Sequence, residues 1–497
     1  MIKKAVTDDK KIFIVLFLYT FTLLFFCSKM SPFYPFNEWS DINLYFNIGK
    51  GIFNGRVPYT ESFDHKGPLI FIIYGLGYLI SNVSFFGMYL IESLAWTCMV
   101  FTAYLTARLY VDKIYAYLVA ILFPVLMLSH TSQGGSAEEF IAITQVISLS
   151  LFIKYFKDKD TILHKPAYML IHGMLCAFVI LTKINLIVFW VFPLLAIFIW
   201  LLLHKEYKNI LQNIGTFIAG LLIVSVPVVT YLALNNALGE AWNVYIVLNK
   251  SYASMGGFSE VIERLAVRFY QRLRFEPFEF IIILIGAFCF SMEYIGNKWG
   301  KIALPLSFIA LFSIIFMSEG YVFYYSVPLY IYVLPAGIAL CKYIWLPNKQ
   351  VAYIILAIIA LLAGIKQKDF FEIQLSELKE RKAPLIDEFS FHIMQEKNAT
   401  LLNLGLDLGN GVFTKANIMP SVKYFISPNL RYDIYPVMRD EQTKYIENKE
   451  VQFIILGVHT FNYDYFSNLS ALNENYTIID SYDFPGYTTY YLYKRND

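Results

Sequence analysis

The chain has little charge. Asp, Glu, Lys and Arg make up 16% of its 497 residues, and 57% of the residues are hydrophobic, whereas a soluble domain carries about 25% charge. This composition excludes a soluble globular protein over most of the length and predicts a polytopic α-helical membrane protein with a soluble tail. The formal net charge of +2 identifies no partner, and we expect none among nucleic acids.

Cysteine is also scarce, and a signal-peptide cleavage site is missing. The five cysteines all fall in or beside apolar runs and none lies in the tail, so we expect no disulfide framework and no Cys-based metal site. Four lysines precede the first apolar run, as in a signal peptide, but no small-x-small site follows it. We therefore expect an uncleaved first span.

Twelve apolar runs are candidates for membrane spans, which need about 20 residues each. One of them, 68–80, is short, and we place it in the outer interface. The short basic loops, such as the one with Arg108 and Lys113, then all lie on the side of the lysine-rich N-terminus, as the positive-inside rule requires. We predict eleven spans with the N-terminus inside, namely 12–29, 85–107, 114–129, 140–156, 167–181, 184–203, 210–234, 278–295, 302–317, 322–340 and 351–365.

This topology places four segments outside: 31–68, 130–139, 235–277 and the tail. Residues 401–404, 453–456, 477–479 and 488–493 resemble strands, and 369–380 and 440–448 resemble helices. We therefore predict a membrane domain over 1–365 and a small extracytoplasmic α/β domain over 366–497.

The segment 37–69 is rich in ionisable residues. It holds four acidic residues, a His, two Lys and an Arg, more than a simple connection beside a bilayer needs, because desolvating charge is costly there. Asp41 and Glu38 precede a run, 42–53, with the apolar spacing of a helix lying on the membrane. Tyr45 would share a face with Asp41, and we expect Gly55 and Pro58 to end the helix.

A second acidic pair, Glu138 and Glu139, follows Gly134, Gly135 and Ser136 at the outer end of the third span. The pair has a structural explanation, in which Ser136 caps a helix and both carboxylates lie in its first turn. It also has a functional explanation, in which one carboxylate faces Asp41 across a shared cavity. Both can hold.

Several cations are candidates for contact with an anionic ligand. Lys183 lies between two apolar runs, where it either snorkels to the surface or serves function. Arg264, Arg268 and Arg272 have i, i+4, i+8 spacing and would form one stripe on a surface helix, which binds either lipid headgroups or a donor phosphate. His65, beside Asp64 and Glu61, is either a hydrogen-bonding residue or a metal ligand. We therefore leave open a divalent cation as cofactor.

An acidic residue after the first span, a Tyr four residues later, G-x-x-P-Y and D-H-K-G-P-L together resemble the GT-C membrane glycosyltransferases. The likeness is to the branch of aminoarabinose transferases and protein O-mannosyltransferases. It matches Asp41, Tyr45, Tyr59, Lys66 and Pro68 position by position, and Glu138 or Glu139 corresponds to the second acidic position. Tyr324 and Tyr325 occupy the place where the family often has His-Tyr.

The resemblance implies transfer of a sugar from a polyprenyl-phosphate donor to a glycan, lipid or protein acceptor of the cell envelope. Asp41 would then act as general base on the acceptor hydroxyl. Lys66, Lys183 and the arginines would stabilise the leaving lipid phosphate. The alternative is a polymerase or flippase of lipid-linked polysaccharide. A transporter would carry charges or broken helices near the midplane of several spans, and here the ionisable residues gather at the predicted outer face.

Overall fold

The structure is a computed structural model that describes residues 2–131, 133–252, 256–344, 385–405, 409–427, 430–458, 460, 462–484 and 488–496. Its internal contacts divide the chain into two compact units. One holds residues 1–28, 91–227 and 254–374. The other holds 29–90, 228–253 and 375–497. The second unit therefore joins the ionisable segment 37–69 to the C-terminal domain.

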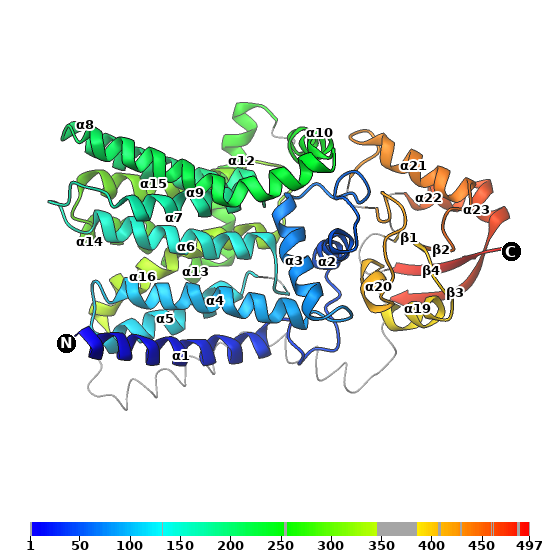
Figure 1. The fold of residues 1–497 in the computed structure, drawn as a ribbon, viewed down its shortest axis with the longest axis horizontal. Helices are drawn as coiled ribbons and strands as arrows, with labels where there is room; N and C mark the ends of the chain where they lie inside the picture. The colour runs from blue at the N-terminus through cyan, green and yellow to red at the C-terminus, as the bar shows by residue number, and fades with distance from the viewer. Residues whose placement is uncertain are drawn as a thin grey trace. The chain divides into compact units, whose positions relative to one another are not determined.

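The first unit is a bundle of apolar helices, several of which run side by side in Figure 1. The long elements that belong to it or enter it are α1 (Ile2–Cys27), α4 (Phe86–Ala107), α5 (Lys113–Leu128), α6 (Ala137–Phe156), α7 (Pro166–Ile180), α8 (Val188–Leu203), α9 (Tyr207–Leu234), α12 (Phe258–Phe275) and α15 (Lys298–Phe316). Shorter helical segments are η1 (Ile184–Ile187), α13 (Pro277–Leu284), η3 (Ile285–Cys289), α14 (Phe290–Tyr294), η4 (Phe323–Tyr332), α16 (Val333–Leu340) and η5 (Cys341–Tyr343).

Within the described residues, eight helical stretches are long and apolar enough to cross a membrane. They correspond to eight of the eleven predicted spans. The predicted spans 114–129 and 167–181 correspond to the shorter apolar helices α5 and α7. The eleventh, 351–365, lies outside the described residues. The predicted fold class, a polytopic helical membrane protein, is confirmed.

In the second unit, α2 (Ser40–Phe53) packs across α3 (Pro68–Ile80). The two helices approach closely at Gly49, where a Cβ would overlap the backbone oxygen of Phe71. The predicted helix 42–53 is confirmed, and it ends before Gly55 as expected. Three short elements follow α9 in this unit, namely α10 (Leu238–Trp242), η2 (Asn243–Leu248) and α11 (Asn249–Tyr252).

The C-terminal part of this unit is the predicted α/β domain. Its sheet has the order β1-β2-β4-β3, in which β1 and β2 are parallel and the other two pairs are antiparallel. Figure 1 shows helices to both sides of the strands. The elements are α19 (Leu385–Met394), β1 (Leu401–Leu404), α20 (Asn410–Lys415), α21 (Pro436–Glu447), β2 (Phe453–Gly457), α22 (Tyr463–Ser467), α23 (Ser470–Asn475), β3 (Tyr476–Phe484) and β4 (Thr488–Arg495). The predicted helix 369–380 lies outside the described residues.

Candidate functional site

Asp41, Tyr45 and Lys66 form one cluster in the second unit. Asp41 lies in the first turn of α2, where the helix dipole favours a carboxylate. The Tyr45 hydroxyl donates to Asp41 Oδ2 at 3.3 Å, as their predicted common face requires. Lys66 Nζ lies 4.0 Å from the same oxygen and 6.0 Å above the Tyr45 ring. The side chain of Asp41 is 27% exposed, so a substrate can reach it.

The backbone that carries Lys66 is tightly held. Tyr59 is fully buried, and its hydroxyl donates to the carbonyl of Lys66 at 2.8 Å. Tyr59 has a φ of 70°, which is rare for a residue with a side chain and persists only where the surroundings enforce it. Asn249 donates to the carbonyl of His65 at 2.5 Å. The predicted site residue Tyr59 thus fixes the position of Lys66 and does not face an open cavity.

Asp64 is a buried carboxyl next to these residues. Its Oδ1 accepts the His65 N–H at 2.7 Å and lies 3.4 Å from His65 Nδ1. Its Oδ2 has no hydrogen-bond partner within the described part of the chain. Burial raises the pKa of Asp64 to about 6, although the nearby Lys66 ammonium acts in the opposite direction. Lys66 therefore lies in the field of two carboxyls, Asp41 and Asp64.

The residues around His65 do not fit a metal centre. Glu61, which we considered as a ligand beside His65 and Asp64, accepts the N–H of Val57 at 2.6 Å and closes its own turn. Among the residues that the structure describes, no group of three His, Cys, Asp or Glu side chains could hold a metal ion. Glu38, two residues before α2, is half-buried.

The first unit has an ion pair of its own. Lys183 Nζ lies 2.6 Å from Glu138 Oε1 and 3.6 Å from the centre of the Tyr325 ring. Glu138 is buried, and its Oε2 has no hydrogen-bond partner among the described residues. The structure therefore brings together two predicted site residues that are 45 positions apart, and it gives Tyr325 a cation to bind.

Glu139 is held differently from its neighbour. Its carboxylate accepts the indole N–H of Trp96 at 2.6 Å and the N–H of Gly135 at 2.9 Å. Its N–H donates to Ser136 Oγ at 3.0 Å, so the predicted helix cap is confirmed. The carboxyl of Glu92 lies beside it and accepts from Ser28 at 2.7 Å. Sequence reasoning missed Glu92, although an acidic residue inside an apolar run is itself a signal.

The three arginines of α12 do not present one open cationic stripe. Arg264 donates to the carbonyl of Met317, and Arg268 lies 4.9 Å from the centre of the Tyr321 ring. Arg272 is buried and pairs with Glu276 at 2.5 Å. Each guanidinium thus has a protein partner that a ligand would have to displace.

His130 was also missed by sequence reasoning. Its Nε2 lies 3.0 Å from Glu276 Oε2, 3.0 Å from the Tyr330 hydroxyl and 3.3 Å from Arg272. Its ring stacks on Phe323 at 4.3 Å. The only sequence signal was a His at the end of an apolar run, and its partners lie more than 140 positions away. This buried cluster connects α5, α12 and η4.

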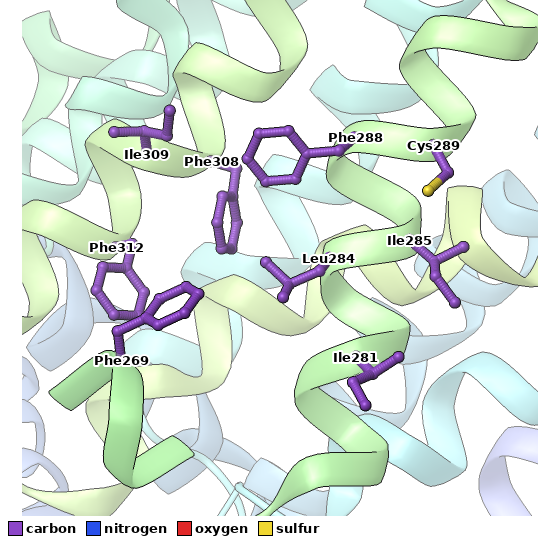
Figure 2. A pocket seen from close by; sticks show the side chains of 9 residues that line it. All are labelled: Phe269, Ile281, Leu284, Ile285, Phe288, Cys289, Phe308, Ile309 and Phe312. Carbon is purple, nitrogen blue, oxygen red and sulfur yellow. The ribbon is translucent and has the colours of Figure 1, made fainter. Parts of the chain in front are cut away.

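An apolar cavity of about 510 Å³ lies among the membrane helices of the first unit. Figure 2 shows its side chains, which come from α12, from the stretch α13–η3 and from α15. They are Phe269, Ile281, Leu284, Ile285, Phe288, Cys289, Phe308, Ile309 and Phe312. Because this lining has no charged group, it suits a hydrocarbon chain.

Comparisons with known proteins agree with this fold. The solved structure of ArnT from Cupriavidus metallidurans bound to undecaprenyl phosphate superimposes with a TM-score of 0.61 at 12% identity, over 96% of this chain and 97% of that one. The apo state of the same protein gives a TM-score of 0.60 at 12% identity, over 98% of each chain. No curated protein matches the sequence.

Residues 48–239 match the family model of the dolichyl-phosphate-mannose-protein mannosyltransferases. This region begins inside α2 and includes the loop with Lys66, the Glu138 turn and Lys183. The resemblance noted from the sequence motifs is thereby confirmed. The chain is a multi-pass membrane protein of the GT-C fold, and its residues 48–239 are similar to the dolichyl-phosphate-mannose-protein mannosyltransferases.

Proposed function

We propose that this protein transfers a sugar from a polyprenyl-phosphate donor to a hydroxyl group of a cell-envelope acceptor, at the outer face of the membrane. The single observation that carries the proposal is the pairing of a reachable carboxylate, Asp41, with a cation 4.0 Å away, Lys66. Transfer from a lipid phosphate needs both a base and a cation. The acceptor is a glycan, a lipid or a protein.

In the proposed reaction, Asp41 takes the proton of the acceptor hydroxyl. The acceptor oxygen then bonds to the anomeric carbon of the sugar, and the bond from that carbon to the phosphate oxygen breaks. The lipid phosphate leaves with the electron pair of that bond. Lys66 stabilises the charge that develops on it, and a fixed cation in a site with little water is most effective.

Lys183 and Glu138, in the first unit, are a further pair of proposed functional residues. We favour Glu138 over Glu139 because the carboxylate of Glu139 is already engaged by Trp96 and Gly135, whereas Glu138 Oε2 has no partner among the described residues. Glu138 holds the Lys183 ammonium over Tyr325, where it meets an anionic group of a substrate.

The apolar cavity of Figure 2 supports a lipid-linked donor. Its volume falls in the range of about 300–1,000 Å³ that is common for ligand sites. One protein of similar fold was solved with undecaprenyl phosphate. We propose that this cavity accommodates a segment of the polyprenyl chain.

The test uses the full-length protein in lipid vesicles with a set of synthetic polyprenyl-phosphate sugars and envelope acceptors. Asp41→Asn should fold and lose sugar transfer, because an amide cannot accept the proton. Glu61→Gln is the matched control, since the Glu61 carboxylate accepts the N–H of Val57 within its own turn, and it should keep normal activity. Near-normal turnover in Asp41→Asn would contradict the assignment and leave Glu38 as the alternative base. Movement of the donor across the vesicle membrane without transfer would indicate a flippase.

A further inference from the structure

We propose that the C-terminal domain is the positioning element of the site: it binds α2 and the loop before Lys66 and so sets the spacing of Asp41 and Lys66. The inference rests on the proposed function, because it assigns those two residues to the reaction. Every contact used below lies inside the second unit.

The first set of contacts, with α2, is centred on Thr414 of α20, which is completely buried. Its hydroxyl donates to Asn43 Oδ1 at 2.9 Å and accepts from Asn47 Nδ2 at 3.1 Å. Both asparagines lie on α2 and are buried. One hydroxyl thus joins two consecutive turns of α2 to α20.

Hydrogen bonds at both ends of α2 extend this first set of contacts. Asn410 donates to Ser40 Oγ at 2.8 Å, and Asn403 of β1 donates to Asn410 Oδ1 at 2.6 Å, so the contact continues into the sheet. At the other end, Lys50 Nζ donates to Asn417 Oδ1 at 2.6 Å and to the carbonyl of Ile418 at 3.2 Å.

The residues of α2 that form these hydrogen bonds lie on one face of the helix. Positions 40, 43, 47 and 50 follow the i, i+3, i+7 spacing that places side chains on a common stripe. With about 100° of rotation per residue, Asp41 and Tyr45 project from the opposite face. The C-terminal domain therefore holds the back of α2 while its front carries the proposed base.

The second set of contacts is with the chain just before Lys66. The N–H of Phe63 donates to the carbonyl of Lys423 at 3.1 Å. The Phe63 ring stacks on Tyr435 with centroids 5.2 Å apart and lies 5.1 Å from Tyr424. One domain thus holds both segments that carry the proposed catalytic groups.

Polar contacts suit this role better than apolar ones. Buried hydrogen bonds are satisfied in one register only, whereas an apolar face tolerates small shifts. A misplacement of about 1 Å can lower a catalysed rate by about 100-fold. A domain that only needed to adhere to α2 would not require buried Asn43, Asn47 and Thr414.

The experiment compares Thr414→Val with Thr414→Ser in the full-length protein. Valine has nearly the same shape as threonine but no hydroxyl, and serine keeps the hydroxyl. We expect Thr414→Val to lower kcat by roughly tenfold with little change in donor KM, in line with the cost of misplacement, and Thr414→Ser to restore most of the rate. Thr443→Val is the matched control, because in the described part of the chain the Thr443 hydroxyl bonds only within α21 and to Tyr465. It should leave kcat unchanged.

Two further measurements separate this inference from the proposed function. Amide hydrogen exchange should show faster exchange of α2 in Thr414→Val and not in Thr443→Val, whatever the activity. In an Asp41→Asn background, Thr414→Val should cause no further loss of the residual rate. Unchanged kcat and unchanged exchange in Thr414→Val would overturn the inference even if Asp41→Asn is inactive. Faster exchange together with an active Asp41→Asn would instead overturn the role of Asp41, and the positioning inference with it.

Discussion

Lys66 Nζ lies 4.0 Å from Asp41 Oδ2, at the limit of an ion pair and beyond hydrogen-bond distance. The two groups attract each other without closing onto each other. This geometry suits a site in which one group meets the donor and the other meets the acceptor.

Replacing Lys66 should reduce use of the donor. Lys66→Ala removes the cation beside the leaving phosphate, and by analogy with lost oxyanion donors it should cost about 2–4 kcal/mol of transition-state stabilisation. The measurement is kcat/KM for the polyprenyl-phosphate sugar. Lys250→Ala, which removes an exposed lysine of α11, is the control. Unchanged donor kinetics with weaker acceptor binding would place Lys66 on the acceptor side.

The Glu138–Lys183 pair should show energetic coupling. Glu138 is buried, so Lys183→Met leaves a carboxylate without its cation, and breaking a buried pair costs about 3–5 kcal/mol. Lys183 is itself 19% exposed, so we expect the lower end of that range. Thermal unfolding should show that Glu138→Gln combined with Lys183→Met is more stable than the sum of the single effects predicts. Strict additivity would show that the two side chains do not interact.

Asp64 should make stability depend on pH. Its pKa in the folded protein is raised from 3.8 to about 6 by burial, so between these values the folded state binds more protons than the unfolded state. Its contribution to the free energy of unfolding should therefore fall as the pH rises from about 4 to about 6, and stay level above. Tm measured across this range should fall less in Asp64→Asn than in the unmodified protein. Parallel Tm profiles would contradict the raised pKa.

Residues 68–80 should not cross the membrane, so the loop after α4 should lie inside. The loop after α4 contains Tyr110, which packs on Phe290 and Tyr294. Asp112 in the same loop is exposed and is therefore a better position for a labelling cysteine than Tyr110. In a background without native cysteines, an impermeant thiol reagent should label Glu263→Cys on intact cells and fail to label Asp112→Cys. The reverse pattern would invert the topology.

Much of this architecture could be predicted from the sequence because it depends on local patterns. Apolar runs of sufficient length correspond to the spans, and the spacing of apolar residues after Asp41 predicted α2 to within two residues of its start. Ser136 caps α6, and Tyr45 reaches Asp41, because helical geometry fixes neighbours three or four positions apart. The strands of the C-terminal domain followed from short apolar segments.

Partner choice could not be predicted, because it depends on residues far apart in the chain. The sequence placed Glu138 and Glu139 together, and only packing showed that Trp96 engages one and Lys183 the other. The arginine spacing of α12 was correct as a helical face, yet contacts with other segments occupy each guanidinium. Thr414 reaches α2 across more than 360 positions. Helical periodicity determines which face a side chain occupies, and tertiary structure decides what that face meets.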